Sequence, residues 1–189
     1  MTLQIAFVCT ILLFAQDVIS GLLPQAEKKT KIAAFSFAEA QYFHRYTNGD
    51  QHEYTPNGQE DLNAWADMVT LQFYRKVKDG EALAATANAV LANYKTNQAM
   101  VVKTSSVPQT KAKPAEHLIV VLFPRPKFIE AVFARFRLRD GVGTAVIYSH
   151  RVYGEKVGNV MSDWLGKNGA AIENHLMKWD TVVKLPLPK

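Results

Sequence analysis

The feature that most constrains the fold is a run of β-favouring segments between Met100 and Tyr153, separated by short turns. The sequence predicts four strands in this run, over residues 100–105, 117–123, 128–139 and 144–152. The second of them, HLIVVLF, has the composition of a central strand that is buried on both faces. Because tight turns join antiparallel neighbours, we expect a single antiparallel sheet.

Further elements are predicted outside this run. They are a hairpin over 37–55, a short helix over 59–65, a strand over 68–77, a helix that begins at Asp79 and a closing helix over 156–179. The helix that begins at Asp79 carries one apolar stripe from Leu83 to Tyr94, which predicts that it packs against the sheet. The chain is therefore expected to form one α+β domain with its helices packed on one face of the sheet.

The predicted hairpin contains two histidines, and a pair of imidazoles can form part of a metal site. If Asn48-Gly49 is a two-residue turn, His44 faces Glu53 across the hairpin and His52 faces Arg45. Since neighbouring positions on a strand point to opposite faces, the two imidazoles would lie on opposite faces. The sequence therefore predicts no metal site here, and a cross-strand polar pair between His44 and Glu53.

An apolar run near the start of the sequence predicts a secretory signal peptide. Residues 5–15 (IAFVCTILLFA) are too few to span a bilayer, which takes about 20 residues, but they match the apolar region of such a leader. A buried N-terminal element of the fold is the competing interpretation. We predict cleavage after Ser20, which would place the protein in the periplasm or outside the cell. A signal peptide over 1–20, a flexible segment over 21–34, a folded domain over 35–179 and a loose tail over 180–189 are then expected.

Motifs that carry catalysis or cofactor binding are missing from the sequence. It contains no G-x-S-x-G, no H-E-x-x-H, no phosphate-binding loop and no dinucleotide fingerprint, and its single cysteine excludes a disulfide framework. Ser149 and His150 are adjacent on a predicted strand, so they point to opposite sides and cannot act together. We therefore predict a protein that is not an enzyme and that uses no cofactor or metal ion. An enzyme assembled from distant residues is an alternative.

The predicted strand over 128–139 carries a row of arginines. Arg135, Arg137 and Arg139 occupy alternate positions and project from one face, and Lys127 and Arg151 are expected to extend this cationic patch. One interpretation is a face that is solvated, or paired with acidic side chains elsewhere in the chain. The other, which we predict, is a docking surface for a protein with an acidic surface, because the planar guanidinium binds carboxylates through two hydrogen bonds.

The same electrostatics allow two further partners for this patch. Anionic lipid headgroups at a membrane surface are an alternative to the acidic protein. Nucleic acid is not expected, since a net charge of +5 is small for a protein that coats it.

Three segments resemble a group of small exported proteobacterial proteins. They are EYTPNGQEDLNAWADMVTLQFYR at 53–75, PAEHLIVVLF at 114–123 and ARFRLRDGVGTAVIYSHRVYG at 134–154. The group includes proteins that resemble the periplasmic immunity proteins found beside phospholipase effectors of type VI secretion. The resemblance spans residues 35–179 and implies a non-catalytic periplasmic protein that binds and inhibits a toxic effector. The order of the predicted strands also resembles that of PsbP-like and Mog1-like proteins.

The main alternative function is the binding of a lipid or another small ligand in the periplasm. It predicts a deep apolar pocket between the sheet and the helices, whereas an inhibitor of another protein predicts a filled core and an external binding surface. An enzyme predicts titratable side chains that converge in a cleft and have shifted pKa values.

Overall fold

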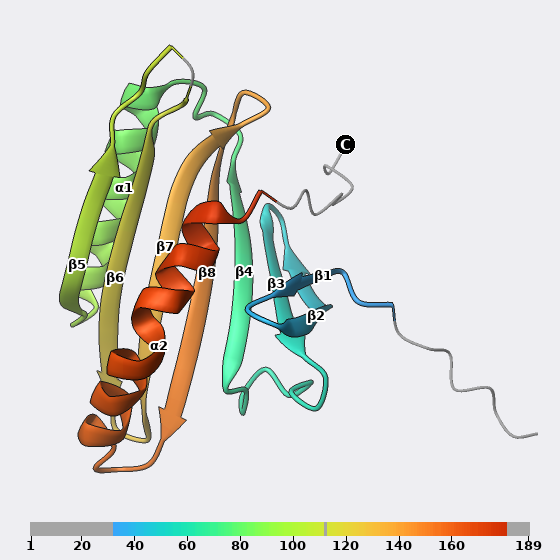
Figure 1. Cartoon of the computed structure of the whole chain (residues 1–189), viewed down its shortest axis with the longest axis vertical. Helices are drawn as coiled ribbons and strands as arrows, with labels where there is room; N and C mark the ends of the chain where they lie inside the picture. Colours follow the sequence, from blue (N-terminus) through green and yellow to red (C-terminus); the bar gives the residue numbers. More distant parts are fainter. Residues whose placement is uncertain (1–31, 112, 181–189) are drawn as a thin grey trace, which may run out of the picture. The chain divides into compact units, whose positions relative to one another are not determined.

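The computed structural model describes residues 32–111 and 113–180, which form eight strands and two helices (Figure 1). The strands are β1 (Phe35–Phe37), β2 (Ala40–Asn48), β3 (Gln51–Pro56), β4 (Asp67–Tyr74), β5 (Met100–Val107), β6 (Glu116–Arg125), β7 (Phe128–Arg139) and β8 (Val142–Tyr153). The helices are α1 (Gly80–Thr96) and α2 (Gly158–Lys178). The predicted signal peptide lies outside the described residues, as do most of the predicted flexible segment and the tail beyond Asp180.

The strands form one antiparallel sheet with the order β1-β2-β3-β4-β8-β7-β6-β5. The last strand in the sequence, β8, lies between β4 and β7, so it joins the first four strands to the other three (Figure 1). The four strands predicted between residues 100 and 153 are β5 to β8, and each lies within two residues of its predicted bounds. The predicted α+β class with a single antiparallel sheet is confirmed.

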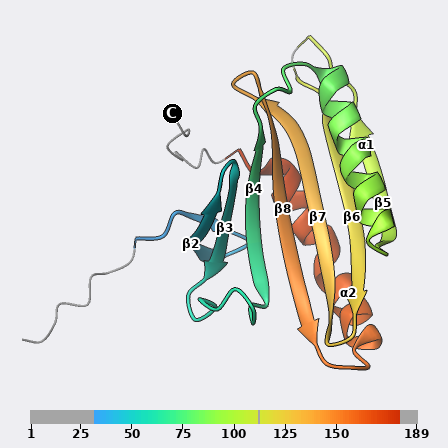
Figure 2. The same ribbon diagram turned by 180° about the vertical axis from the view of Figure 1, so that it is seen from behind.

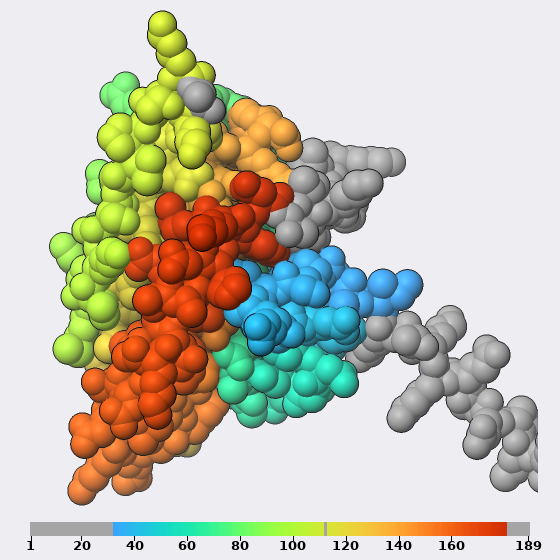
Figure 3. All heavy atoms as spheres, viewed as in Figure 1, coloured from blue at the N-terminus to red at the C-terminus, as the bar shows by residue number. Residues whose placement is uncertain are grey.

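The two helices cover opposite faces of this sheet. Leu83 of α1 packs in one apolar cluster with Val121 of β6, whereas Leu176 of α2 packs in a second cluster with the adjacent residue Val120. Adjacent residues on a strand point to opposite faces. Figures 1 and 3 show α2 in front of the sheet, and Figure 2 shows α1 in front of the other side.

The expectation that both helices pack on one face is therefore wrong. The physical reason lies in the central strands β6, β7 and β8, which carry apolar side chains on both of their faces. Each apolar face needs a cover that removes it from water, so one helix on one side would leave half of the core exposed.

The start of α1 agrees with the prediction. The Asp79 carboxylate accepts a hydrogen bond from the backbone N–H of Ala82 at 2.8 Å, and Glu81 lies in the first turn. The Asp79 carboxylate satisfies a free backbone N–H group of the first turn, and the negative charges of Asp79 and Glu81 interact favourably with the positive end of the helix dipole. Leu83 and Ala87, the first members of the predicted apolar stripe, are buried against the sheet.

The predicted helix over 59–65 does not form, and turns connect β3 to β4 instead. The side-chain oxygen Oε1 of Gln59 accepts hydrogen bonds from the backbone N–H groups of Ala66 and Asp67, at 2.8 and 2.7 Å. A polar side chain that bonds to backbone groups further along the chain stabilises a loop in place of a helix. This loop holds Asp67 at the start of β4.

The β2–β3 hairpin differs from the predicted register. Asn48 pairs with Gln51, so Gly49 and Asp50 form the turn, and Gly49 has a φ of +56° that glycine adopts without strain. A bulge between His44 and Tyr46 then shifts the register again. The physical reason is that the intervening arginine turns its guanidinium onto β3, where it donates to Thr55 Oγ1 and to the Pro56 carbonyl oxygen.

This register places His44 and His52 on the same face, so the prediction of opposite faces is wrong. Their ring centroids lie 6.1 Å apart, and both imidazoles hydrogen-bond to the hydroxyl of Thr47, at 2.8 and 3.0 Å. The expected pair of His44 with Glu53 is also absent, because Glu53 faces Tyr46. The described residues contain no group of three or more His, Cys, Asp or Glu side chains that could hold a metal ion.

Burial of His52 and His117 predicts that the fold loses stability in mild acid. Desolvation lowers the pKa of both imidazoles, and Nε2 of each is buried with no hydrogen-bond partner among the described residues. The folded state therefore holds the neutral rings, while the unfolded chain takes up protons at about pH 6.5. We expect the free energy of unfolding to fall as the pH drops below about 6.5, by at most about 1.4 kcal/mol per pH unit for each histidine.

Urea unfolding followed at about pH 7.5 and about pH 5.5 measures this loss. A double variant, His52→Gln with His117→Gln, removes both titrating groups and should flatten the pH dependence between these two conditions. A wild-type protein that is equally stable at both pH values would contradict the prediction.

Candidate functional site

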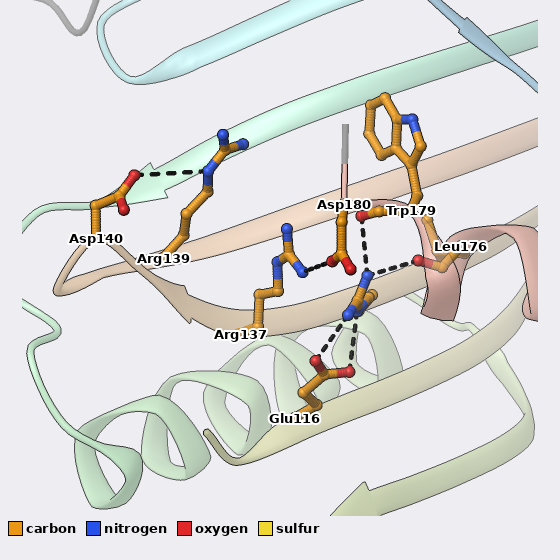
Figure 4. Close-up of polar contacts among 8 residues, drawn as sticks. Glu116, Arg137, Arg139, Asp140, Leu176, Trp179 and Asp180 are labelled. Atoms are coloured by element: carbon orange, nitrogen blue, oxygen red, sulfur yellow. Dashed lines mark hydrogen bonds and ion pairs between the residues drawn. The ribbon is translucent and has the colours of Figure 1, made fainter. Parts of the chain in front are cut away.

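Arg135, the first of the predicted contact residues, lies inside the protein and is only 2% exposed. Its guanidinium donates to both carboxylate oxygens of Glu116, at 2.7 and 3.1 Å, and to the backbone carbonyl oxygens of Leu176 and Trp179, at 2.8 and 3.2 Å. Figure 4 shows these acceptors converging from β6 and from the end of α2. Arg135 therefore ties α2 to the sheet, and its prediction as a partner contact is wrong.

Arg137 and Arg139 are also paired within the chain. Arg137 Nη1 donates to Asp180 Oδ1 at 2.5 Å, and this hydrogen bond lowers the pKa of that carboxyl (Figure 4). Arg139 lies 3.7 Å from the carboxylate of its neighbour Asp140. The structure thus agrees with the interpretation in which this arginine row pairs with acidic side chains of the same chain.

The two other predicted contact residues do not extend the row. Arg151 lies on the face covered by α1, where its guanidinium pairs with Glu130 at 2.9 Å and stacks on the rings of Trp65 and Phe128. Lys127 is exposed in the turn between β6 and β7. The five residues are divided between two faces and a turn, so they do not form the single cationic patch that the sequence predicts.

A polar cluster that the sequence does not reveal lies beneath α2. Asp67 on β4 faces His150 on β8, and its Oδ1 accepts hydrogen bonds from His150 Nδ1 at 2.8 Å and from the hydroxyl of Tyr148 at 2.7 Å. The ring of His150 stacks on the indole of Trp164 from α2, with centroids 3.9 Å apart and planes within 4°. We call Asp67, Tyr148, His150 and Trp164 the α2-face cluster.

Hydrogen bonding keeps Asp67 ionised in this cluster. Burial raises the pKa of the Asp67 carboxyl, but the hydrogen bonds from His150, Tyr148 and Gln59 outweigh that effect, so the pKa lies below its usual value. Burial and the charge of Asp67 raise the pKa of Tyr148, which therefore stays a neutral hydrogen-bond donor. The result is a carboxylate that is held by a phenol, an amide and an imidazole.

A cavity of about 350 Å³ lies next to the α2-face cluster. Its walls come from the β1–β2 turn, from β2, β4 and β8, and from α2. The lining residues are Ala38, Glu39, Ala40, Tyr42, Asp67, Tyr148, Trp164, Asn168, Ala171, Ile172 and His175. We call this space the α2-side cavity. Its lining combines aromatic rings with two carboxylates, unlike the deep apolar pocket expected for a lipid.

A second cavity, of about 580 Å³, lies on the other face of the sheet beside α1. Thr70 and Gln72 of β4 and Tyr94 of α1 are among the residues that line it, together with Glu130, which is paired with Arg151. Apolar side chains such as Val90, Phe123 and Ile147 form more of its wall than hydroxyl and amide groups do. This α1-side cavity therefore has part of the character that the lipid-binding alternative predicts.

The edge strand β5 is the largest exposed element of the sheet. All eight of its residues are exposed, and among the residues that the structure describes it pairs with β6 alone. Met100, Val101 and Val102 form an apolar stretch at its start, where Met100 is 61% and Val102 is 52% exposed. At the opposite edge, β1 has only three residues.

A model of an uncharacterised protein family matches residues 30–179. The chain belongs to this family. The match includes the sheet, both helices, the α2-face cluster and the whole of β5, so the domain described above is the family's domain. No curated protein matches the sequence at a significant level.

Several solved structures are similar to this chain at low sequence identity. The Ran-binding protein Mog1p of Saccharomyces cerevisiae matches with a TM-score of 0.47 and 8% identity, over 72% of this chain and 83% of that one. A point variant of protein Mog1 matches with a TM-score of 0.49 and 8% identity, over 72% and 84%. Protein PA94 of Pseudomonas aeruginosa matches with a TM-score of 0.37 and 12% identity, over 70% and 94%.

Neither helix of the family's domain is both long enough and apolar enough to cross a membrane.

The sequence does not reveal the α2-face cluster because Asp67 lies far along the chain from Tyr148, His150 and Trp164, and the pairing of β4 with β8 brings it beside them. His150 was noticed only for its neighbour Ser149, which lies on the other face. Knowledge of the strand order would have been needed to place Asp67 opposite His150.

Proposed function

We propose that the chain is a non-catalytic domain that binds another protein, and that the partner adds a strand to the sheet at β5. The observation that carries this proposal is the exposure of all eight residues of an edge strand that pairs on one side only. Its outer row of backbone N–H and C=O groups is open to another strand. In strand addition, main-chain hydrogen bonds supply affinity and alternate side chains supply specificity.

The side chains of β5 suit such a contact. Apolar Met100, Val101 and Val102 at its start offer surface that a partner would remove from water. Features that hinder the pairing of an edge strand with another strand lie in this first half. The register shifts between Val101 and Lys103, and Lys103 pairs with Glu173 of α2 at 2.6 Å. The second half, from Thr104 to Val107, is regular and paired with β6 throughout.

The geometry of the α2-face cluster supports a non-catalytic role. His150 hydrogen-bonds to Asp67, and no serine, threonine or cysteine of the described residues hydrogen-bonds to His150. One face of its ring is covered by Trp164. A nucleophile activated by a histidine must lie within hydrogen-bond reach of it, so the cluster resembles a binding wall more than a catalytic centre.

Export and inhibition of a toxic effector form the more specific part of the proposal. They rest on the apolar run over 5–15 and on the resemblance to periplasmic immunity proteins. The arginine row gives no support, because Arg135 is buried and Arg137 is paired. N-terminal sequencing of the protein recovered from the cell envelope tests the export step: we expect the chain to begin at Gly21, and a chain that retains residues 1–20 would contradict it.

Affinity capture with a β5 variant tests the binding proposal. The variant combines Met100→Lys with Val102→Lys, which places two charges on the exposed edge and should change the free energy of unfolding by no more than about 1 kcal/mol. A partner captured from the native envelope fraction by the wild-type protein should bind this variant about tenfold more weakly or not at all. Hydrogen exchange should show new protection of β5 in the complex.

The matched control is Val160→Lys, which places a charge at a valine on α2 that is 53% exposed. This variant should capture the same partner as well as the wild-type protein does. If the β5 variant also binds that partner with unchanged affinity, the edge of β5 is not the binding site. Turnover of a substrate by the purified wild-type chain would contradict the non-catalytic role.

A further inference from the structure

We propose that the α2-side cavity binds a small molecule through an alkylammonium group. The cavity lies on the α2-covered face near β1 and β2, whereas β5 forms the opposite edge of the sheet. The ligand site is thus separate from the protein-binding edge. Its volume of about 350 Å³ falls within the range of about 300–1,000 Å³ that small-molecule sites occupy.

The charges that line the cavity favour a cation. Asp67 and Glu39 contribute two carboxylates, whereas the described lining residues include one histidine, His175, and no lysine or arginine. The half-buried carboxylates Glu116 and Glu130, in contrast, are each paired with a guanidinium. Asp67 lies 2.8 Å from the imidazole of His150, which carries no permanent charge, and it also accepts hydrogen bonds from Tyr148 and Gln59. A cationic ligand would share this carboxylate with the groups that already hold it.

The aromatic side chains around the cavity suit the same group. Tyr42 and Tyr148 come from the sheet, and Trp164 of α2 stacks with Tyr148, with ring centroids 6.5 Å apart. Aromatic ring faces attract ammonium groups, and the attraction is largest where water is excluded. Asp67 lines the same cavity as Tyr42 and accepts a hydrogen bond from the Tyr148 hydroxyl at 2.7 Å. Carboxylate and rings together form a wall that recognises a positive charge on an apolar body.

The turn that carries Glu39 is held in a strained conformation. Ala38 and Glu39 connect β1 to β2, and their φ angles are +45° and +67°, in the left-handed region that favours glycine or asparagine. Strained backbone of this kind is concentrated at sites that hold ligands. Here the strained residues line the cavity and place a carboxylate on its wall. Figure 3 shows the region of β1 and β2, in blue, beside α2, in red.

Titration with matched cationic and neutral probes tests the proposal on the full chain. The cationic probes are choline and n-butylammonium, and their neutral counterparts are 3,3-dimethylbutan-1-ol and n-butanol, which have the same shape without the charge. Binding is measured by calorimetry and by the shift of the Trp164 indole N–H signal in NMR spectra. We expect at least one cationic probe to saturate the site and to bind about tenfold more tightly than its neutral counterpart.

Three substitutions with the same change in net charge locate the site. Asp67→Asn should weaken binding of that probe by about tenfold, and Glu39→Gln by about threefold. Asp140→Asn, at an exposed carboxylate in the β7–β8 turn, should leave binding unchanged. Glu39 is exposed and bonded to none of the cluster, so Glu39→Gln keeps the test valid if Asp67→Asn fails to fold.

Two kinds of result would overturn the proposal. One is the absence of saturable binding by either cationic probe up to about 50 mM, well beyond the millimolar range of weak ligands. The other is binding that does not depend on the charge, shown by neutral probes of equal affinity or by Asp67→Asn and Glu39→Gln proteins that bind as the wild type does. Neither result bears on β5, so failure of this site and failure of the protein-binding proposal can be told apart.

Discussion

Replacing Arg135 with methionine is expected to lower the free energy of unfolding by about 3–5 kcal/mol. The substitution leaves Glu116 with a carboxylate that has lost both of its guanidinium bonds in a site where Arg135 is almost completely buried. At the end of α2, the carbonyl oxygen of Trp179 also loses its guanidinium donor, and that of Leu176 keeps the 3.3 Å hydrogen bond from the backbone N–H of Trp179. Urea or thermal unfolding of the purified variant measures the change.

The control for this prediction is Arg139→Met, on the same strand face. Arg139 is more exposed and lies 3.7 Å from Asp140, so its loss should cost no more than about 1 kcal/mol. Adding Glu116→Gln to Arg135→Met removes the uncompensated charge and should recover part of the lost stability. An Arg135→Met protein that is as stable as the wild type but loses a partner would restore the interpretation of Arg135 as a docking residue.

Shortening the most buried leucine side chain of either helix is expected to lower the free energy of unfolding about as much as Arg135→Met does. Leu83 of α1 and Leu176 of α2 are fully buried, each in its own cluster on its own face of the sheet. Leu83→Ala and Leu176→Ala should each lower the free energy of unfolding by about 2–5 kcal/mol, since each removes apolar contacts and leaves a cavity. Chemical denaturation of the two variants provides the measurement.

Val160→Ala, at an exposed position of α2, is the matched control and should change stability by no more than about 0.5 kcal/mol. The two leucine variants also test the arrangement of the layers. If Leu83→Ala left the stability unchanged, α1 would not be a cover of the second face, and the two-sided core would be incorrect.

Local sequence patterns were sufficient for the strands and for the start of α1. The alternation in β7 and the apolar run in β6 predicted strands that the structure contains, because burial on one or both faces imposes those patterns. Asp79 predicted the helix start because its carboxylate satisfies a backbone N–H only three residues away. The prediction of a helix over 59–65 was wrong because its residues form hydrogen bonds outside the segment, such as those that Gln59 Oε1 accepts from the backbone N–H groups of Ala66 and Asp67.

Interpretation of the side chains failed where the partner lies far along the chain. The row of Arg135, Arg137 and Arg139 was identified, but its exposure depended on Glu116 and on the end of α2, which no local pattern connects to β7. In the same way, the arrival of His44 on the face of His52 depended on the bulge between His44 and Tyr46.

The sequence by itself determined most of the strands, both of the helices that form and the antiparallel pairing, because hydrophobic periodicity, capping and turn chemistry act within a few residues. Only the tertiary structure decided that β8 lies between β4 and β7 and that the helices cover opposite faces. Those choices brought Asp67 beside His150 and buried Arg135 under α2. They depend on which apolar faces meet and on which charges are paired, and both are properties of residues distant in the sequence.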